Sequence, residues 1–230
     1  MTSVVVLDYG FGNVRSMVRA LANVGADVTL TSDVQQARDA DGLVVPGVGA
    51  FAAVMRGLTA VDGDRIIYER LQEGKPVLGV CVGLQIMFEQ GVEHDILCQG
   101  LGLIRGTVRQ LDAPVVPHMG WNTLSSAPKS TLFEGLEDQR FYFVHSYAAQ
   151  ADEVLALQNN ASEESRQATD MQHGQWQLLQ QYPLNITTCH YGDETFVAAF
   201  EQGPLSATQF HPEKSGDAGA ALLRNWLRIL

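Results

Sequence analysis

From the N-terminus to about residue 90, short apolar runs alternate with segments whose apolar residues recur at helical spacing. Strands are predicted over residues 4–8, 28–31, 42–46 and 76–81. Three helices are predicted from apolar residues at helical spacing. The first follows a candidate N-cap at Asn13 and contains Val14, Met17, Val18 and Leu21. The second covers residues 66–71, and the third contains Leu84, Met87 and Phe88. Strands that alternate with helices pair in parallel under a cover of helices, so the sequence predicts an α/β fold around a mostly parallel sheet.

Beyond Gly91 the pattern changes to short strands joined by polar turns, which indicates an additional antiparallel portion. These strands are predicted over residues 101–111, 141–147, 154–157, 195–200 and 205–210. The chain is expected to end in a helix, with Ala218, Leu222, Asn225 and Trp226 on one face. Residues 159–182 are rich in Gln, Ser, Glu and Asp and are predicted to form a surface insertion.

The charge and the cysteines limit the class of protein. A formal net charge of −11 leaves no basic surface for nucleic acid or for an anionic membrane, and both are excluded as expected partners. No apolar stretch approaches the roughly 18 residues of a membrane span, and the N-terminus has no basic leader. Three cysteines without a regular framework fit a reducing compartment, so a cytoplasmic location is expected.

A cysteine flanked by glycines stands where a predicted strand meets the next helix, in the GVCVG segment (79–83). A tight strand-to-helix turn holds its central side chain above the sheet, and glycines two residues away let the neighbouring backbone approach closely. Helix N-terminal amides favour a thiolate at Cys81, and the N–H of Val82 is a candidate oxyanion donor. The alternative is that Cys81 is a small buried cysteine that ends a strand.

A histidine and a glutamate precede the last predicted helix, in the QFHPE segment (209–213). If residues 210–213 are extended, His211 and Glu213 project to the same side, and Glu213 orients the imidazole. A cysteine with a histidine base and an orienting carboxylate is the arrangement used in covalent acyl transfer. The 130 positions between Cys81 and His211 do not oppose this, because such groups meet in the fold. The alternative is a loop histidine beside a solvated glutamate.

The VPGVG segment (45–49) follows another predicted strand. Ligands bind at the carboxyl ends of the strands in open α/β sheets, so this loop and Cys81 are expected to face the same crevice. The backbone N–H groups of Val48 and Gly49 are therefore candidate donors to an oxyanion or to a carboxylate. A plain turn with glycines at positive φ is the alternative.

These segments together resemble a known family. The elbow GVCVGLQ (79–85), the loop PGVG (46–49) and QFHPEKS (209–215) are similar to the class I (triad) glutamine amidotransferases, which have a flavodoxin-like α/β fold. Within that family, DYGFGN (8–13), VPGVGAF (45–51), PHMGWN (117–122), YFVHSY (142–147) and HPEKSGDAGAALLRNW (211–226) resemble the glutaminase subunits of imidazole glycerol phosphate synthases. The resemblance covers nearly the whole chain and implies one amidotransferase domain over residues 1–230, with no metal and no cofactor.

The resemblance implies a role for each matching residue. Cys81 attacks the carboxamide carbon of glutamine, His211 carries the proton to the leaving ammonia, and Glu213 holds His211. A γ-glutamyl thioester forms, and water then releases glutamate. The amino-acid end of glutamine is expected to be held by side chains and backbone groups of five residues. They are Gln85, Glu93, His145, Ser146 and Tyr147.

The resemblance also implies a partner. In the family the ammonia passes to a (β/α)₈ cyclase subunit, where it reacts with a phosphorylated ribulosyl intermediate to give imidazole glycerol phosphate and an aminoimidazole carboxamide ribotide in histidine biosynthesis. A heterodimer is expected, and the residues that match its interface are Asn13, Trp121, Asn122, Tyr142 and Lys214. Without the resemblance, the residue types favour the alternative that Trp121 is an ordinary core residue and Lys214 a solvated charge beside the last helix.

Val48 suggests how the activity is restrained. Many relatives outside this subunit carry a glycine there, and a β-branched residue makes a peptide flip to positive φ more costly. In the family that flip completes the oxyanion hole when the partner binds its substrate. The isolated chain is therefore expected to be a weak glutaminase that the complex activates.

Three other functions remain open at this level. The first is a triad glutaminase of another synthase, such as those for guanylate, anthranilate or carbamoyl phosphate. The second is an elbow hydrolase or thiol protease, and the third is a catalytically silent regulatory subunit. The PHMGWN segment argues against the first, and the presence of Cys81, His211 and Glu213 argues against the last.

Overall fold

The computed structural model describes residues 1–164 and 175–230. In this part of the chain the largest sheet has seven strands in the order β11-β12-β13-β4-β3-β1-β2. The five strands from β2 to β13 pair in parallel, and β12 and β11 continue the sheet antiparallel. The bounds are β1 Ser3–Leu7, β2 Asp27–Thr31, β3 Gly42–Gly47, β4 Val77–Cys81, β11 Asn185–Tyr191, β12 Glu194–Gln202 and β13 Leu205–Thr208.

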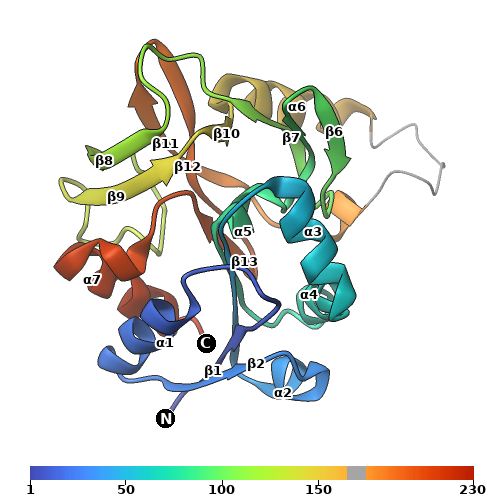
Figure 1. Ribbon diagram of the computed structural model, residues 1–230, viewed down its shortest axis with the longest axis vertical. Helices are drawn as coiled ribbons and strands as arrows, with labels where there is room; N and C mark the ends of the chain where they lie inside the picture. The colour runs from blue at the N-terminus through green and yellow to red at the C-terminus, as the bar shows by residue number, and fades with distance from the viewer. Residues whose placement is uncertain (165–174) are drawn as a thin grey trace.

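Helices cover both faces of this sheet (Figure 1). α1 packs against α7 on one side, and α3 packs against α4 on the other. Every residue of β3 and β4 is buried, as expected for strands with both faces covered. The helices are α1 Val14–Asn23, α2 Val34–Asp39, α3 Phe51–Ala60, α4 Gly63–Gln72, α5 Val82–Gln85, α6 Ala151–Glu164 and α7 Gly216–Leu227. The predicted α/β fold with a mostly parallel sheet is confirmed.

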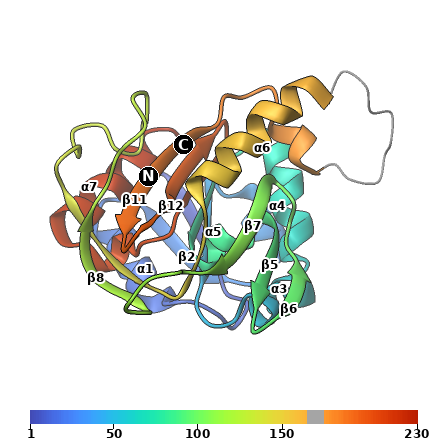
Figure 2. The same ribbon diagram turned by 90° about the horizontal axis from the view of Figure 1, so that it is seen from above.

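Two smaller sheets stand above the large one. The first has the order β10-β7-β5-β6 and the second pairs β8 with β9. Figure 2 shows α6 lying across β7 of the first of these sheets. The bounds are β5 Phe88–Glu93, β6 Ile96–Gln99, β7 Ile104–Gln110, β8 His118–Thr123, β9 Arg140–His145 and β10 Tyr147–Ala149. The expected antiparallel portion is present, although β5 and β7 pair in parallel.

The strand predicted over residues 154–157 is wrong, because these residues lie within α6. Ala151 and Val154 are buried and Leu157 is half-buried, so the apolar positions recur every three residues on one helix face. A short apolar run of this kind does not by its periodicity distinguish a strand from one turn of a helix.

The helix expected through Phe88 is also shorter than predicted. α5 ends at Gln85, and β5 begins at Phe88 after a turn. Every residue from Val82 to Phe88 is buried, so the apolar spacing there reflects complete burial rather than one helix face.

The predicted surface insertion over residues 159–182 is described only in part. Its beginning belongs to α6, and the 3₁₀ helix η1 (Gln175–Leu179) ends in the fully buried Leu179. Residues 165–174 lie outside the described residues. In the described part of the chain no helix is long and apolar enough to cross a membrane.

The strand order brings distant segments to one edge of the sheet. β13 is the last strand of the chain, yet it lies next to β4, with Thr208 opposite Val80. On the other side of β4, Gly47 of β3 stands opposite Cys81. The segments that follow these three strands therefore meet at the same carboxyl edge.

Candidate active site

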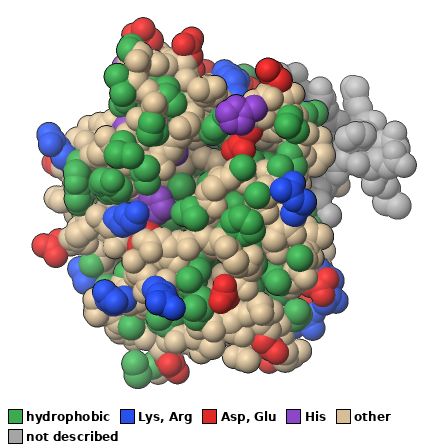
Figure 3. All heavy atoms as spheres, in the orientation of Figure 1, with side chains coloured by type: hydrophobic (Ala, Val, Ile, Leu, Met, Phe, Trp, Pro, Cys, Tyr) green, Lys and Arg blue, Asp and Glu red, His purple; other side chains and the backbone are tan. Residues whose placement is uncertain are grey.

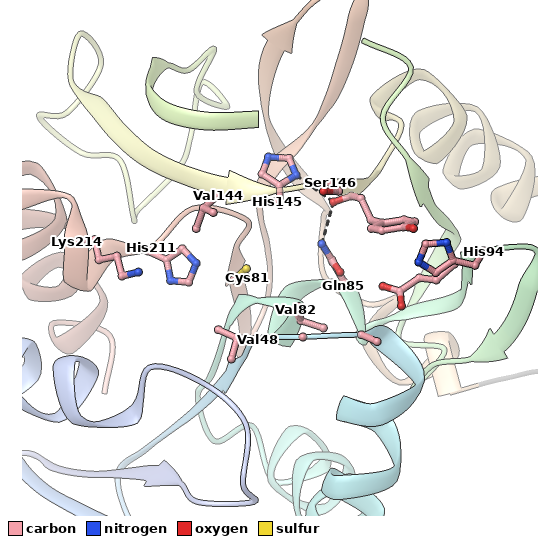
Figure 4. Close-up of a pocket in the computed structure, with 14 residues that line it drawn as sticks. Val48, Cys81, Val82, Gln85, His94, Val144, His145, Ser146, His211 and Lys214 are labelled. Carbon is pink, nitrogen blue, oxygen red and sulfur yellow. Dashed lines mark hydrogen bonds between the residues drawn. The ribbon is translucent and has the colours of Figure 1, made fainter. Parts of the chain in front are cut away.

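A cavity of about 460 Å³ opens at this edge (Figure 4). It is lined by residues from the loop after β3, the end of β4 and helix α5, the β5–β6 hairpin, β9, the start of β10 and the segment after β13. These residues are Val48, Gly49, Ala50, Cys81, Val82, Gln85, Glu93, His94, Val144, His145, Ser146, Tyr147, His211 and Lys214. All three segments predicted to carry chemistry thus contribute to one cavity.

Cys81 sits at a strained turn at the bottom of the cavity. Its backbone has φ 58° and ψ −113°, a conformation that non-glycine residues rarely adopt, and only 4% of the residue is exposed. The turn is tight because its neighbours are glycines. A Cβ on Gly83 would lie 2.0 Å from the carbonyl oxygen of Val45, and one on Gly79 would lie 2.6 Å from that of Gly83. The helix that follows Cys81 is a single turn, shorter than expected.

His211 lies beside Cys81 and is held by Glu213. The Nδ1 atom of His211 donates to Oε1 of Glu213 over 2.8 Å, and both side chains are almost completely buried. The two residues meet through the 3₁₀ turn η2 (Pro212–Lys214) and not through an extended segment, so that part of the prediction is wrong. Proline at the first position favours such a turn.

The pKa of His211 is raised to about 10. Burial lowers it, but hydrogen bonding and attraction from Cys81 and from Glu213 together outweigh burial. The Nε2 atom is buried and forms no well-aligned hydrogen bond with the described residues. The imidazole of His211 therefore retains its proton beside Cys81 at neutral pH.

The residues expected to hold the amino-acid end of glutamine also line the cavity. The amide nitrogen of Gln85 donates to the carbonyl oxygen of Tyr147 over 2.8 Å, so this side chain has a fixed orientation (Figure 4). Glu93 ends β5, and the next residue, His94, also lines the cavity although it was not predicted. His94 and Asp95 both have positive φ in the two-residue β5–β6 turn.

The oxyanion candidates also line the cavity. Val48 is 40% exposed at the mouth of the cavity, Gly49 has φ 100°, and Val82 follows the cysteine. The hydroxyl of Tyr9, a buried residue that was not predicted, donates to the carbonyl oxygen of Pro46. Burial, and to a lesser extent Cys81, raises the pKa of Tyr9. Tyr9 lies two residues beyond β1, whose carboxyl end is at the same edge of the sheet, and this position could have marked it as a candidate site residue.

Three of the residues expected at a partner interface, Trp121, Tyr142 and Lys214, form a group beside the cavity, which we call the β8–β9 face. Trp121 is 52% exposed and contacts Tyr142 edge to face, so its interpretation as a core residue is wrong. Lys214, which lines the cavity, lies 5.9 Å from the centre of the Tyr142 ring. Met119, 62% exposed, adds to this face and was not predicted. Figure 3 shows hydrophobic side chains gathered over β8 and β9, with a hollow beside them.

Two other expected interface residues are bonded within the chain. Asn122 donates to the carbonyl oxygen of His190. Asn13 precedes α1 as predicted, but its side chain makes no cap and instead donates to Glu213.

The comparisons with known proteins define the class. Residues 5–230 match the family model for glutamine amidotransferase class-I. A solved structure of a glutamine amidotransferase covers 98% of this chain and 97% of that one, with TM-score 0.67 and 18% identity. PurLQS from Thermotoga maritima covers 99% and 98%, with TM-score 0.66 and 16% identity, and both structures show the shared fold. The chain belongs to the class-I glutamine amidotransferases and is an enzyme of that family.

Its sequence relatives narrow the class. It is 60% identical to the imidazole glycerol phosphate synthase subunit HisH of Bifidobacterium longum, over 100% of each chain. The same subunit of Thermobifida fusca is 54% identical, over 99% of this chain and 98% of the relative, and that of Corynebacterium diphtheriae is 51% identical over 100% of each. Within the family, the chain groups with the HisH subunits.

Proposed function

We propose that this chain is the glutaminase subunit of an imidazole glycerol phosphate synthase. It hydrolyses glutamine to glutamate and ammonia and delivers the ammonia to a cyclase subunit. The cyclase then makes imidazole glycerol phosphate and aminoimidazole carboxamide ribotide in histidine biosynthesis. The observation that carries the proposal is the strained Cys81 in one cavity with His211, which Glu213 holds. The identity of 51–60% with HisH subunits over nearly the full length supports it.

The first half of the proposed reaction forms a thioester. The Cys81 thiolate attacks the side-chain carboxamide carbon of glutamine, and the carbonyl oxygen becomes an oxyanion. Backbone N–H groups of Val82 and of the loop at Val48 and Gly49 stabilise that charge. The C–N bond then breaks, and the proton on His211 moves to the leaving nitrogen, which departs as ammonia.

The second half releases glutamate. His211, now neutral, takes a proton from a water molecule that attacks the thioester carbon, and the C–S bond breaks. Glu213 keeps the Nδ1–H of His211 in place in both halves, so Nε2 remains the atom that exchanges protons. The raised pKa of His211 keeps the imidazole protonated, so that it can give a proton to the leaving nitrogen.

The cavity also suits the charged end of glutamine. The amide nitrogen of Gln85 already donates to Tyr147 and to Gln209, so its carbonyl oxygen serves as the acceptor for the α-ammonium group. The carboxylate of Glu93, which also lines the cavity, supplies a negative charge for the positively charged α-ammonium group. The backbone of His145, Ser146 and Tyr147 lines the rest of this end.

We place the partner on the β8–β9 face. Its exposed Trp121 and Met119 stand beside Tyr142 and Lys214, and aromatic residues are enriched at protein interfaces. Because Lys214 lines the cavity, a subunit bound here would close over the exit for ammonia.

We further propose that residues 1–230 form one amidotransferase domain and that the enzyme works in the cytoplasm, which fits three free cysteines.

The test is Cys81→Ala in the complex with the (β/α)₈ cyclase subunit. Glutamine-dependent synthesis should be abolished, while synthesis with added ammonium salt should persist. Cys98→Ala, at a half-buried cysteine outside the cavity, is the matched control and should retain both activities. Glutamine-dependent synthesis by the Cys81→Ala complex would refute the proposed nucleophile. Failure of the chain to co-purify with the cyclase would refute the proposed partner.

A further inference from the structure

Gln209 is a completely buried polar residue that lies behind the cavity, outside its lining. It stands one residue beyond β13 and two before His211. Its backbone N–H donates to the carbonyl oxygen of Ala198 in β12 over 2.8 Å, which fixes the main chain at this point. It contributes no atom to the bonds that form or break in the proposed reaction.

The carboxamide of Gln209 bridges two functional side chains. Its Oε1 accepts a hydrogen bond from Nε2 of Gln85 over 3.0 Å, and its own Nε2 donates to the sulfur of Cys81 over 3.9 Å. A flipped amide would place an oxygen against the sulfur and bring the nitrogens of two amides together. Only one orientation therefore satisfies both contacts.

The support of Gln85 continues on its other side. The Tyr147 carbonyl that accepts from Gln85 also faces Nδ1 of His145 over 3.0 Å. A carbonyl oxygen only accepts, so Nδ1 of His145 carries the proton and its Nε2 is an acceptor. His118 meets that Nε2 with its Nδ1 over 3.1 Å. The tautomers of both histidines are thus determined. In the series of hydrogen bonds that runs from His118 through His145, Tyr147, Gln85 and Gln209 to the sulfur of Cys81, the donor and the acceptor of each bond are therefore fixed.

We propose that Gln209 is a positioning residue for glutamine hydrolysis. It holds the Gln85 carboxamide so that the carbonyl oxygen of Gln85 faces the α-ammonium group, and it presents an N–H to the Cys81 thiolate. A donor facing the sulfur stabilises the charged form relative to the neutral thiol. One buried amide thereby links the group that binds the substrate to the group that attacks it. This inference deepens the proposed function and rests on it for the identity of the substrate.

Two substitutions separate the two contacts. Gln209→Met keeps the volume but removes the acceptor for Gln85 and the donor to sulfur. Gln209→Glu keeps an acceptor for Gln85 but replaces the donor with a carboxylate oxygen that repels a thiolate. The matched control is Gln202→Met, at another buried glutamine, whose amide donates to the carbonyl oxygens of Leu179 and Tyr182.

Each variant is assayed for glutaminase activity in the complex with the cyclase subunit. Gln209→Met should raise the KM for glutamine and lower kcat, each by about tenfold. Gln209→Glu should lower kcat by about tenfold or more while its KM stays near that of the wild type. Gln202→Met should change the melting temperature but neither kinetic constant.

A second measurement does not depend on the substrate. The rate at which iodoacetamide alkylates Cys81 at neutral pH, followed by mass spectrometry of its peptide, should fall several-fold in both Gln209 variants and stay unchanged in Gln202→Met. If Gln209→Met keeps the wild-type KM and alkylation rate, whatever its melting temperature, the inference is overturned. If the wild-type complex releases no ammonia from glutamine, the proposed function fails, and the alkylation rates still decide whether Gln209 acts on the sulfur.

Discussion

The side-chain amide of Asn13 donates a hydrogen bond to Oε1 of Glu213 over 3.2 Å, although 200 positions separate the two residues. The same oxygen accepts from Nδ1 of His211, while Oε2 of Glu213 is buried without a hydrogen bond among the described residues. Asn13 therefore helps to orient the carboxylate of Glu213, which in turn orients the imidazole of His211. The start of α1 is in this way tied to the chemistry of the cavity.

Substitutions at Asn13 should therefore affect catalysis. Asn13→Ala removes one neutral donor and should lower kcat by about threefold to tenfold. Asn13→Asp places a second carboxylate beside Glu213 and should lower it further, because the two like charges repel. The measurement is glutamine turnover at saturating cyclase subunit, so that weaker association does not contribute. Wild-type kcat in Asn13→Asp would show that the contact has no catalytic effect.

Gly83 should tolerate no side chain. A Cβ there would lie 2.0 Å from the carbonyl oxygen of Val45, so Gly83→Ala must displace backbone in the buried centre of the sheet. We expect the free energy of unfolding to fall by about 3 kcal/mol or more, with loss of glutaminase activity. The comparison is Gly25→Ala, where φ is 100° but the space is open. That change should cost only about 1–2 kcal/mol. Equal losses in urea denaturation would contradict this account of the elbow.

Val48 should restrain the isolated chain. Glycine adopts positive φ without strain, so Val48→Gly should make the oxyanion loop easier to rearrange and raise the glutaminase activity measured without the cyclase subunit. Val115→Gly, at an exposed valine away from the cavity, is the control and should leave that activity unchanged. A fall in the activity of Val48→Gly would mean that the valine supports the active loop instead.

The buried histidine pair should make the protein sensitive to acid. Burial lowers the pKa of His118 to about 4 and is the main cause that lowers that of His145 to about 3, both from an ordinary 6.5. Between about pH 6.5 and 4 the unfolded chain therefore binds protons that the folded chain does not, and the free energy of unfolding decreases as the pH falls.

His118→Phe tests this effect. Phenylalanine fills the slot between Phe143 and Tyr191, on which the His118 ring is stacked, and it does not titrate. Between pH 7 and about pH 5 the wild type should lose about 1–2 kcal/mol more of its unfolding free energy than the variant, as measured by urea denaturation. Parallel losses in the two proteins would show that His118 does not contribute to the acid sensitivity.

Local sequence patterns predict most of the fold. The runs that became β1, β3 and β4 are continuously apolar because both of their faces are buried, and glycines mark the turn at Cys81. The two elements predicted wrongly are the helix expected through Phe88, where every residue is buried, and the strand expected over residues 154–157, where the apolar spacing of one helical turn resembles that of a short strand. Residues 82–88 are buried on every side, and residues 154–157 show too few positions to distinguish the two periods.

The cavity could be predicted in outline because the segments that line it follow parallel strands that end at one edge. Gln209, Asn13 and His118 were missed as supporting residues for a different reason. Each acts through a hydrogen bond to a residue far away in the sequence, and a single chain gives no signal for such pairs. All three residues do stand within quoted segments: Gln209 in QFHPEKS, His118 in PHMGWN and Asn13 in DYGFGN. That position marks them as candidates without indicating what they contact.

The place of β13 beside β4 has a consequence for protein synthesis. A nascent polypeptide that has emerged from the ribosome as far as α6 already carries Cys81, but β4 still has an open edge where β13 will pair. His211 and Glu213 are translated only after β13, 130 and 132 positions later than Cys81. An unfinished polypeptide consequently has a thiol without its base until β13 has paired with β4.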